Sequence, residues 1–116
     1  MSTLRERSLS GASIRKTTFT SSHWPDYTVE VRSVTGAKKM EIADACRGND
    51  GEIDTAKLVP AMIVESVYDP STGEQVYGPA DRDALMNESA AALDEIWNDA
   101  VAPMNGYGSQ TATEKN

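Results

Sequence analysis

Oxygen-bearing side chains cluster in the segment VYDPSTGEQVYG, which makes it the first place to look for a metal site. They are Asp69, Ser71, Thr72 and Glu74. A calcium loop of the EF-hand type needs oxygen ligands at positions 1, 3, 5 and 12 around a glycine at position 6. With Gly73 at position 6, Tyr68, Pro70 and Pro79 stand at ligand positions 1, 3 and 12. The segment therefore predicts a turn between two short extended pieces, and no calcium site.

A second glycine loop and two rare reactive side chains are the remaining candidates for chemistry. With Gly51 at position 6 of a calcium loop, Cys46 and Lys57 stand at ligand positions, and a lysine repels the cation. His23 is the only histidine and Cys46 the only cysteine, and neither lies in a nucleophile, zinc or nucleotide-binding motif. The sequence favours a protein that is no enzyme and needs no metal or cofactor, with Cys46 as a small buried side chain.

Charge divides the chain into two parts. Residues 1–39 hold seven basic and three acidic residues, a net charge of +4, and residues 40–116 hold four basic and fifteen acidic residues, a net charge of −11. This asymmetry favours an interaction surface or head-to-tail contacts between copies, although both parts could simply be solvated. The acidic body argues against nucleic-acid binding. No apolar run approaches the roughly 18 residues that span a membrane, and no export signal is visible, so we expect a cytoplasmic protein.

The pattern of apolar residues predicts one small α+β domain over residues 14–106. Ser-rich or polar segments at 1–13 and 107–116 are expected to be flexible tails. Alternation in YTVEVRSV predicts that residues 27–34 form a half-buried strand, paired in a hairpin with residues 14–20 across the turn SSHWPD. Three to four helices are expected to follow the hairpin.

Capping residues mark where these helices begin. Thr35 can cap the first helix and Asp54 the second. Within the second, Pro60 either stands at the true helix start or kinks the helix, because proline lacks an amide hydrogen. A short extended turn segment is expected near 65–77, and Pro79 suits the start of a further helix. The first helix is expected to bury Ala37, Met40, Ala43 and Cys46.

The clearest helix covers residues 89–104, and Pro103 and Gly106 are expected to stop it. Its apolar residues recur at the spacing of one helical face. They are Leu93, Ile96, Trp97, Ala100, Val101 and Met104.

Five short motifs follow one another along residues 17–106. They are a Trp-containing turn at Trp24, R-x-V-T-G from Arg32 to Gly36, V-x-D-P-x-T-G-x-x-V from Val67 to Val76, S-x-x-A-L-x-x-I from Ser89 to Ile96, and N-G at Asn105-Gly106. In this order they resemble the tail assembly chaperones of long-tailed bacteriophages. Each motif is a turn or a cap, so the ordered set carries the resemblance.

The resemblance implies a protein of the host bacterial cytoplasm that binds the tape measure protein, a very long and mostly helical chain. It implies that the protein keeps this chain soluble and helps to recruit tail tube subunits. It also implies a longer form made by ribosomal frameshifting. Glu114-Lys115-Asn116 can be encoded as GAA AAA AAC, which contains a slippery codon run. The partners would be the tape measure protein, the tail tube protein and the longer form, and the chain could also be a homo-oligomer.

We expect the partner-binding surface on the second apolar segment and the last helix, at Met62, Ile63, Trp97 and Val101. Trp24, in the hairpin turn, is a further aromatic anchor. The alternative for the first four is that they form the core, since most apolar helix stripes face inward.

Two other functions stay open. The chain could be a virion component, a head–tail connector or tail terminator, which would form rings and remain in purified particles. It could also be an acidic inhibitor that mimics DNA and binds a basic protein in a salt-sensitive way. The basic N-terminal part opposes this last interpretation.

Overall fold

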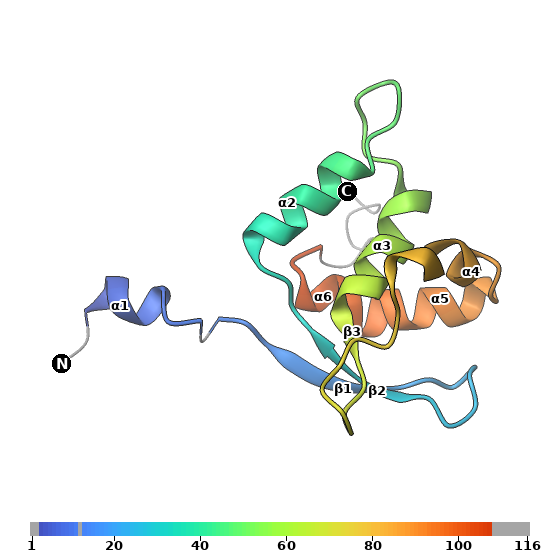
Figure 1. The fold of residues 1–116 in the computed structure, drawn as a ribbon, viewed down its shortest axis with the longest axis horizontal. Coiled ribbons are helices and arrows are strands. Elements are labelled where there is room, and N and C mark those ends of the chain that lie inside the picture. Colours follow the sequence, from blue (N-terminus) through green and yellow to red (C-terminus); the bar gives the residue numbers. More distant parts are fainter. Residues whose placement is uncertain (1–2, 12, 108–116) are drawn as a thin grey trace, which may run out of the picture.

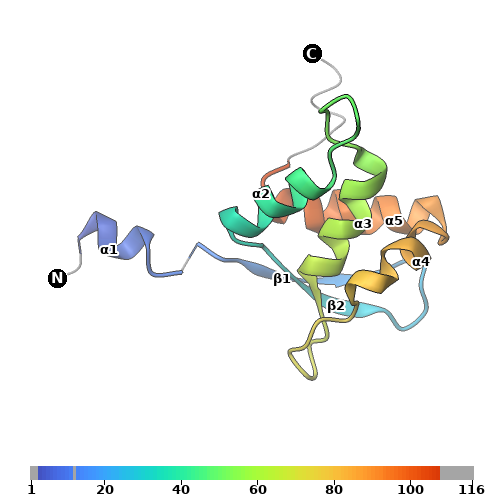
Figure 2. The ribbon, with the colours of Figure 1, turned by 45° about the horizontal axis from the view of Figure 1, so that its top comes forward.

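The chain folds into a three-stranded antiparallel sheet with its main helices packed on one face (Figures 1 and 2). The structure is a computed structural model and describes residues 3–11 and 13–107. The expected α+β class is confirmed. In chain order the elements are α1 (Leu4–Ser8), β1 (Lys16–Thr20), β2 (Thr28–Arg32), α2 (Gly36–Ala45), α3 (Thr55–Ser66), β3 (Val67–Tyr68), the 3-10 turn η1 (Pro79–Asp81), α4 (Arg82–Met86), α5 (Ala90–Ile96), the π-helix η2 (Trp97–Val101) and α6 (Ala102–Met104).

The predicted hairpin forms. β1 and β2 pair antiparallel with Phe19 opposite Val29. Phe19, Val29 and Val31 are buried, while the residues between them point away from the core. This alternation is the period of two that a half-buried strand requires.

The oxygen-rich segment is a turn, as predicted. The Asp69 carboxylate accepts hydrogen bonds from the backbone N of Ser71 (2.8 Å) and from its Oγ (2.6 Å), and these bonds hold the pKa of Asp69 below its usual value. The backbone N of Gly73 donates to the carbonyl of Asp69 (2.8 Å). Gly73 has φ of 76°, a left-handed conformation that glycine adopts without steric cost.

The strand before this turn belongs to the main sheet. β3 pairs with β2, placing Val67 opposite Val31. The sequence predicted pairing across the turn, and a single bridge between Tyr68 and Gln75 is formed there. Val67 is completely buried, so its pairing with the central strand places its side chain in the core.

α2 begins where the sequence placed it but buries a different face. Thr35 Oγ1 accepts a hydrogen bond from the backbone N of Lys38 (3.1 Å). The buried residues are Ile42 and Cys46, whereas Met40, expected in the core, is 62% exposed. An α-helix turns once in 3.6 residues, so apolar residues at every third position drift around the helix and do not stay on one face.

α3 is continuous through Pro60. Asp54 caps it by accepting a hydrogen bond from the backbone N of Ala56 (3.0 Å), and Pro60 lies inside the helix. A helix start at Pro60 is therefore wrong. Pro60 cannot donate the usual bond, and burial of nearly every residue from 58 to 66 offsets that loss.

The last helical run, from α5 through α6, confirms the predicted apolar stripe with one change of geometry. Leu93, Ile96 and Val101 are buried. At the end of η2 the backbone N of Ala102 donates to the carbonyl of Trp97, one residue further back than in an α-helix. Pro103 lies inside α6 and does not stop the helix. The wider turn directly before it changes the spacing between the proline ring and the carbonyl groups of the preceding turn, with which the ring clashes in a regular α-helix.

The predicted tails differ from the structure at two places. The N-terminal segment contains α1, in which no residue is buried, and Figure 1 shows it standing away from the other elements. Tyr107, assigned to the C-terminal tail, packs on Trp97 with ring centroids 5.4 Å apart, and Lys39 Nζ lies 4.4 Å from its ring centroid. The flexibility of both tails stays a prediction, and residues 114–116 lie outside the described residues.

The buried side chain of Asn105 joins three separate parts of the chain. Its Oδ1 accepts a hydrogen bond from the backbone N of Val34 (2.7 Å). Its Nδ2 donates to Ser66 Oγ (3.2 Å) and to the carbonyl of Val101 (2.9 Å). Gly106 follows with φ of 78°, which ends the helix. The N-G motif is therefore a structural connection between the exit of β2, the end of α3 and the last helix.

We predict that Asn105→Ala lowers the free energy of unfolding by about 1 to 3 kcal/mol, because it leaves the partly buried Val34 amide and the buried Ser66 hydroxyl without their partner. Urea unfolding followed by circular dichroism measures this. Asn87→Ala, at the exposed end of α4, is the matched control and should change stability by less than about 0.5 kcal/mol. Equal losses in the two variants would contradict the role of Asn105.

Candidate functional site

Four of the five residues expected at the partner surface lie in the core. Met62, Ile63 and Val101 are completely buried, and Trp97 is 6% exposed. The apolar faces of α3 and the last helix pack on each other and on the sheet, so they present no surface to a partner. Because these four residues are buried, the predicted partner surface does not lie at them. Trp24 is half-buried and remains accessible.

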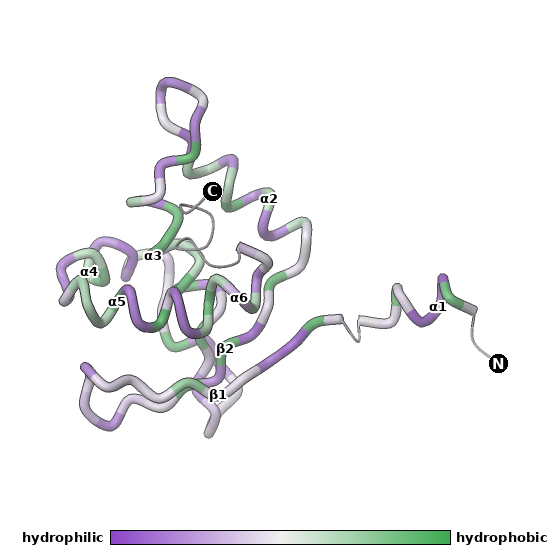
Figure 3. Tube along the Cα trace, turned by 180° about the vertical axis from the view of Figure 1, so that it is seen from behind, coloured by the Kyte–Doolittle hydropathy of each residue, from purple (hydrophilic) through white to green (hydrophobic). Residues whose placement is uncertain are grey.

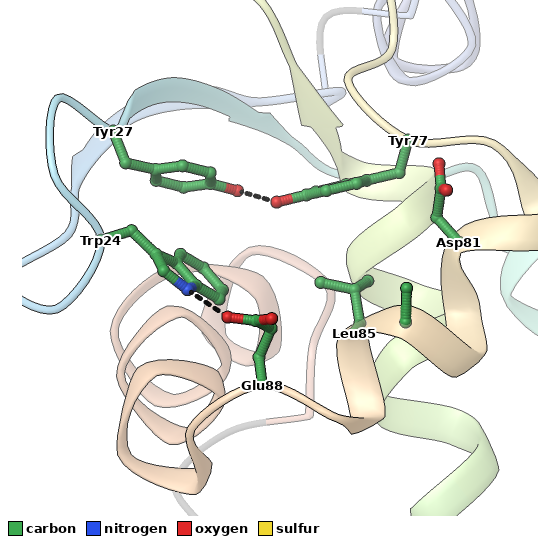
Figure 4. A pocket seen from close by; sticks show the side chains of 7 residues that line it. Trp24, Tyr27, Tyr77, Asp81, Leu85 and Glu88 are labelled. Atoms are coloured by element: carbon green, nitrogen blue, oxygen red, sulfur yellow. Dashed lines mark hydrogen bonds between the residues drawn. The ribbon is translucent and has the colours of Figure 1, made fainter.

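Trp24 forms one wall of a pocket with a volume of about 340 Å³. Figure 4 shows how residues distant in sequence meet there: Trp24 and Tyr27 come from the hairpin turn, Tyr77 precedes η1, and Glu88 follows α4. The full lining is Trp24, Tyr27, Tyr77, Asp81, Ala84, Leu85 and Glu88.

The hairpin turn is fixed by serine hydroxyls and by one carboxylate of α5. Ser21 Oγ accepts hydrogen bonds from the backbone N of His23 and of Trp24, each 3.0 Å long. Glu95 accepts hydrogen bonds from the hydroxyl of Ser22 and from its backbone N (2.9 Å). These bonds from Ser22 hold the pKa of Glu95 below its usual value. The last helix therefore determines where Trp24 stands.

The aromatic rings of the pocket support one another. The ring centroids of Trp24 and Tyr27 are 4.8 Å apart with the planes tilted by 52°, a favourable geometry for aromatic pairs. The hydroxyls of Tyr27 and Tyr77 are hydrogen-bonded at 2.7 Å. Burial raises the pKa of both tyrosines, so both stay neutral donors and acceptors.

Two carboxylates make the pocket acidic. Glu88 Oε1 accepts a hydrogen bond from Trp24 Nε1 (3.2 Å), and Asp81 Oδ2 accepts one from the backbone N of Gly78 (2.8 Å). None of the seven lining residues is basic. Aromatic faces beside carboxylates attract a cation. The arrangement therefore suits a guanidinium or ammonium group carried on an apolar stem.

Sequence reasoning found Trp24 but missed the rest of this pocket. Tyr77 and Glu88 are separated from Trp24 by most of the domain, and no local spacing connects them. The available signal was an aromatic residue two positions before Pro79 and an acidic residue between two helices. Such residues also occur on ordinary solvated surfaces, so they indicate no site by themselves.

Within residues 3–11 and 13–107, no cluster of three or more His, Cys, Asp or Glu side chains could hold a metal ion. None of the helices in the same part of the chain has the length and hydropathy that crossing a membrane requires. No family model, curated protein sequence or solved structure matches the chain at a significant level.

The tyrosine pair predicts how stability depends on pH. In the unfolded chain both phenols ionise near pH 10, whereas the fold keeps them neutral. The unfolded chain therefore loses protons first, and the free energy of unfolding falls as the pH rises above 10.

The double variant Y27F/Y77F should show a shallower fall over this pH range in urea unfolding experiments. Some dependence should remain, because burial also raises the pKa of Tyr107. An unchanged slope in the double variant would contradict the buried, neutral state of the pair.

Proposed function

We propose that this protein is a tail assembly chaperone of a long-tailed bacteriophage that binds the tape measure protein and keeps it soluble. The observation that carries the proposal is the ordered set of five motifs over residues 17–106. Several of these motifs form the turns and caps that position the domain: Thr35 caps α2, Asp69 to Gly73 turns the chain, and Asn105 joins three elements. A shared set of such positions is what a common fold would preserve.

The distribution of apolar and acidic residues supports this role. A long helix with an apolar stripe aggregates unless another surface covers the stripe. The domain offers an accessible aromatic pocket, and its C-terminal part carries a net charge of −11. Covering the helix with acidic domains would shield apolar surface and add repulsive charge, which favours solubility.

The size of the pocket fits reversible binding. A volume of about 340 Å³ holds only one or two side chains, so a single domain contributes modest affinity. Several copies along one long helix would bind it firmly together, and each could still leave when tail tube subunits arrive. We infer that the protein acts in the host cytoplasm and recruits those subunits while it covers the helix.

Coexpression with the long helix-rich protein encoded downstream tests this function. We expect the long protein to stay soluble and to co-purify with the chain. Trp24→Ala should lower the co-purified amount at least tenfold, because aromatic anchors carry much of the binding energy at interfaces. Met40→Ala, a change at an exposed apolar residue of α2, is the control and should have no effect.

The gene order is a separate test. DNA downstream should contain a slippery run at codons 114–116, an overlapping second frame and then a very long gene. Absence of both the overlap and the long gene would contradict the proposal. Presence of the chain as a ring in purified virions would instead support the connector or terminator alternative.

A further inference from the structure

The N-terminal arm, residues 3–11, exposes side chains that normally seek a partner. Leu4 is 77% exposed and Leu9 is 69% exposed. Figures 1 and 3 show the arm projecting from the domain, and the colours of Figure 3 mark hydrophobic positions along it. A helix as short as α1 is marginal in water without packing. Two exposed leucines on such an arm provide apolar side chains that could dock on another surface.

The arm is also basic, and its charges are unpaired. The guanidinium groups of Arg5 and Arg7 form no ion pair or hydrogen bond among the described residues. The arm holds two basic residues and one acidic residue, a net charge of +1, and residues 12–16 add two further basic residues. Residues 17–116 hold seven basic and seventeen acidic residues, a net charge of −10. The arm therefore complements the body of the same protein in charge.

The Trp24 pocket offers what such an arm needs. Glu88 and Asp81 each use one carboxylate oxygen in a hydrogen bond, and in the part of the chain that the structure describes the other oxygen of each has no partner. Trp24 and Tyr27 supply ring faces for a cation. Ala84 and Leu85 supply an apolar wall for a leucine.

The geometry favours exchange between two copies. The arm joins β1 at Lys16, and the turn that carries Trp24 follows the other end of β1, after Thr20. Figures 1 and 2 show α1 pointing away from that turn. An arm that points away from its own pocket is free to reach the pocket of a neighbour, and reciprocal exchange closes a dimer.

We propose that the arm of one copy binds the Trp24 pocket of a second copy, with Arg5 or Arg7 beside Glu88 and the arm leucines on the apolar wall. The resulting self-association is sensitive to salt, because the attraction is between charges near the surface. This inference does not depend on the identity of any other partner.

A charge-swap experiment tests the exchange on the purified full chain. Sedimentation velocity at low salt should show dimers in the unaltered protein, and about 1 M salt, which screens charges beyond about 3 Å, should dissociate them. R5E/R7E and E88K should each raise the dissociation constant at least tenfold. An equimolar mixture of the two variants should associate again, because the acidic arm of R5E/R7E then meets the lysine introduced by E88K, and the basic arm of E88K meets the unaltered Glu88 of R5E/R7E.

Glu74→Lys, at an exposed acid in the turn after β3, is the control and should dimerise like the unaltered chain. Circular dichroism verifies that E88K is folded, and Glu88→Gln replaces it if it is not. The proposal is overturned if the unaltered chain is monomeric at every concentration, if R5E/R7E dimerises normally, or if a folded pocket variant does.

The outcome is distinguishable from that of the coexpression experiment. The arm and a long helical partner would compete for the same pocket. R5E/R7E removes this competition, so it should capture the partner at least as well as the unaltered chain. Loss of dimers with retained capture would support both proposals, and retained dimers in R5E/R7E would overturn the arm exchange alone.

Discussion

The buried amide of Asn105 ties the last helix to the exit of β2 and to the end of α3, two parts of the chain that the pairing of β2 with β3 already holds together. An amide side chain provides a donor and an acceptor, and here it uses both: the backbone N of Val34 donates to it, and Ser66 and the carbonyl of Val101 accept from it. The exit of β2, the end of α3 and the last helix are thereby fixed against one another. Removing the amide would leave polar groups buried in the core, so this arrangement is strongly specified.

The position of the pocket follows from this frame. The last helix presents Glu95 to the hairpin turn, and the turn presents Trp24 and Tyr27. α3 packs against η1 and α4, which places Glu88 opposite the indole. Segments from both halves of the domain must be in place before three rings and two carboxylates can meet. The pocket is therefore a product of the whole fold.

Burial of the apolar stripes limits how this domain can bind another protein. The apolar faces of α3 and the last helix are buried in the core, where Met62, Ile63 and Val101 have no exposed surface. The accessible pocket at Trp24 is aromatic, acidic and small. Such a surface favours one or two anchoring side chains and long-range attraction over a broad apolar contact, which is compatible with a partner that must later be released.

The sequence by itself determined the elements whose cause is local. Alternation placed the hairpin, Thr35 and Asp54 capped their helices, and Asp69 with Gly73 made the turn, because each acts on residues only a few positions away. Tertiary structure decided that β3 joins β2, that α2 buries Ile42 and exposes Met40, and that Trp97 is core while Trp24 is surface. These outcomes depend on which faces meet in space. Burial and pocket formation depend on contacts between segments that are distant in sequence, so a local sequence pattern cannot predict them.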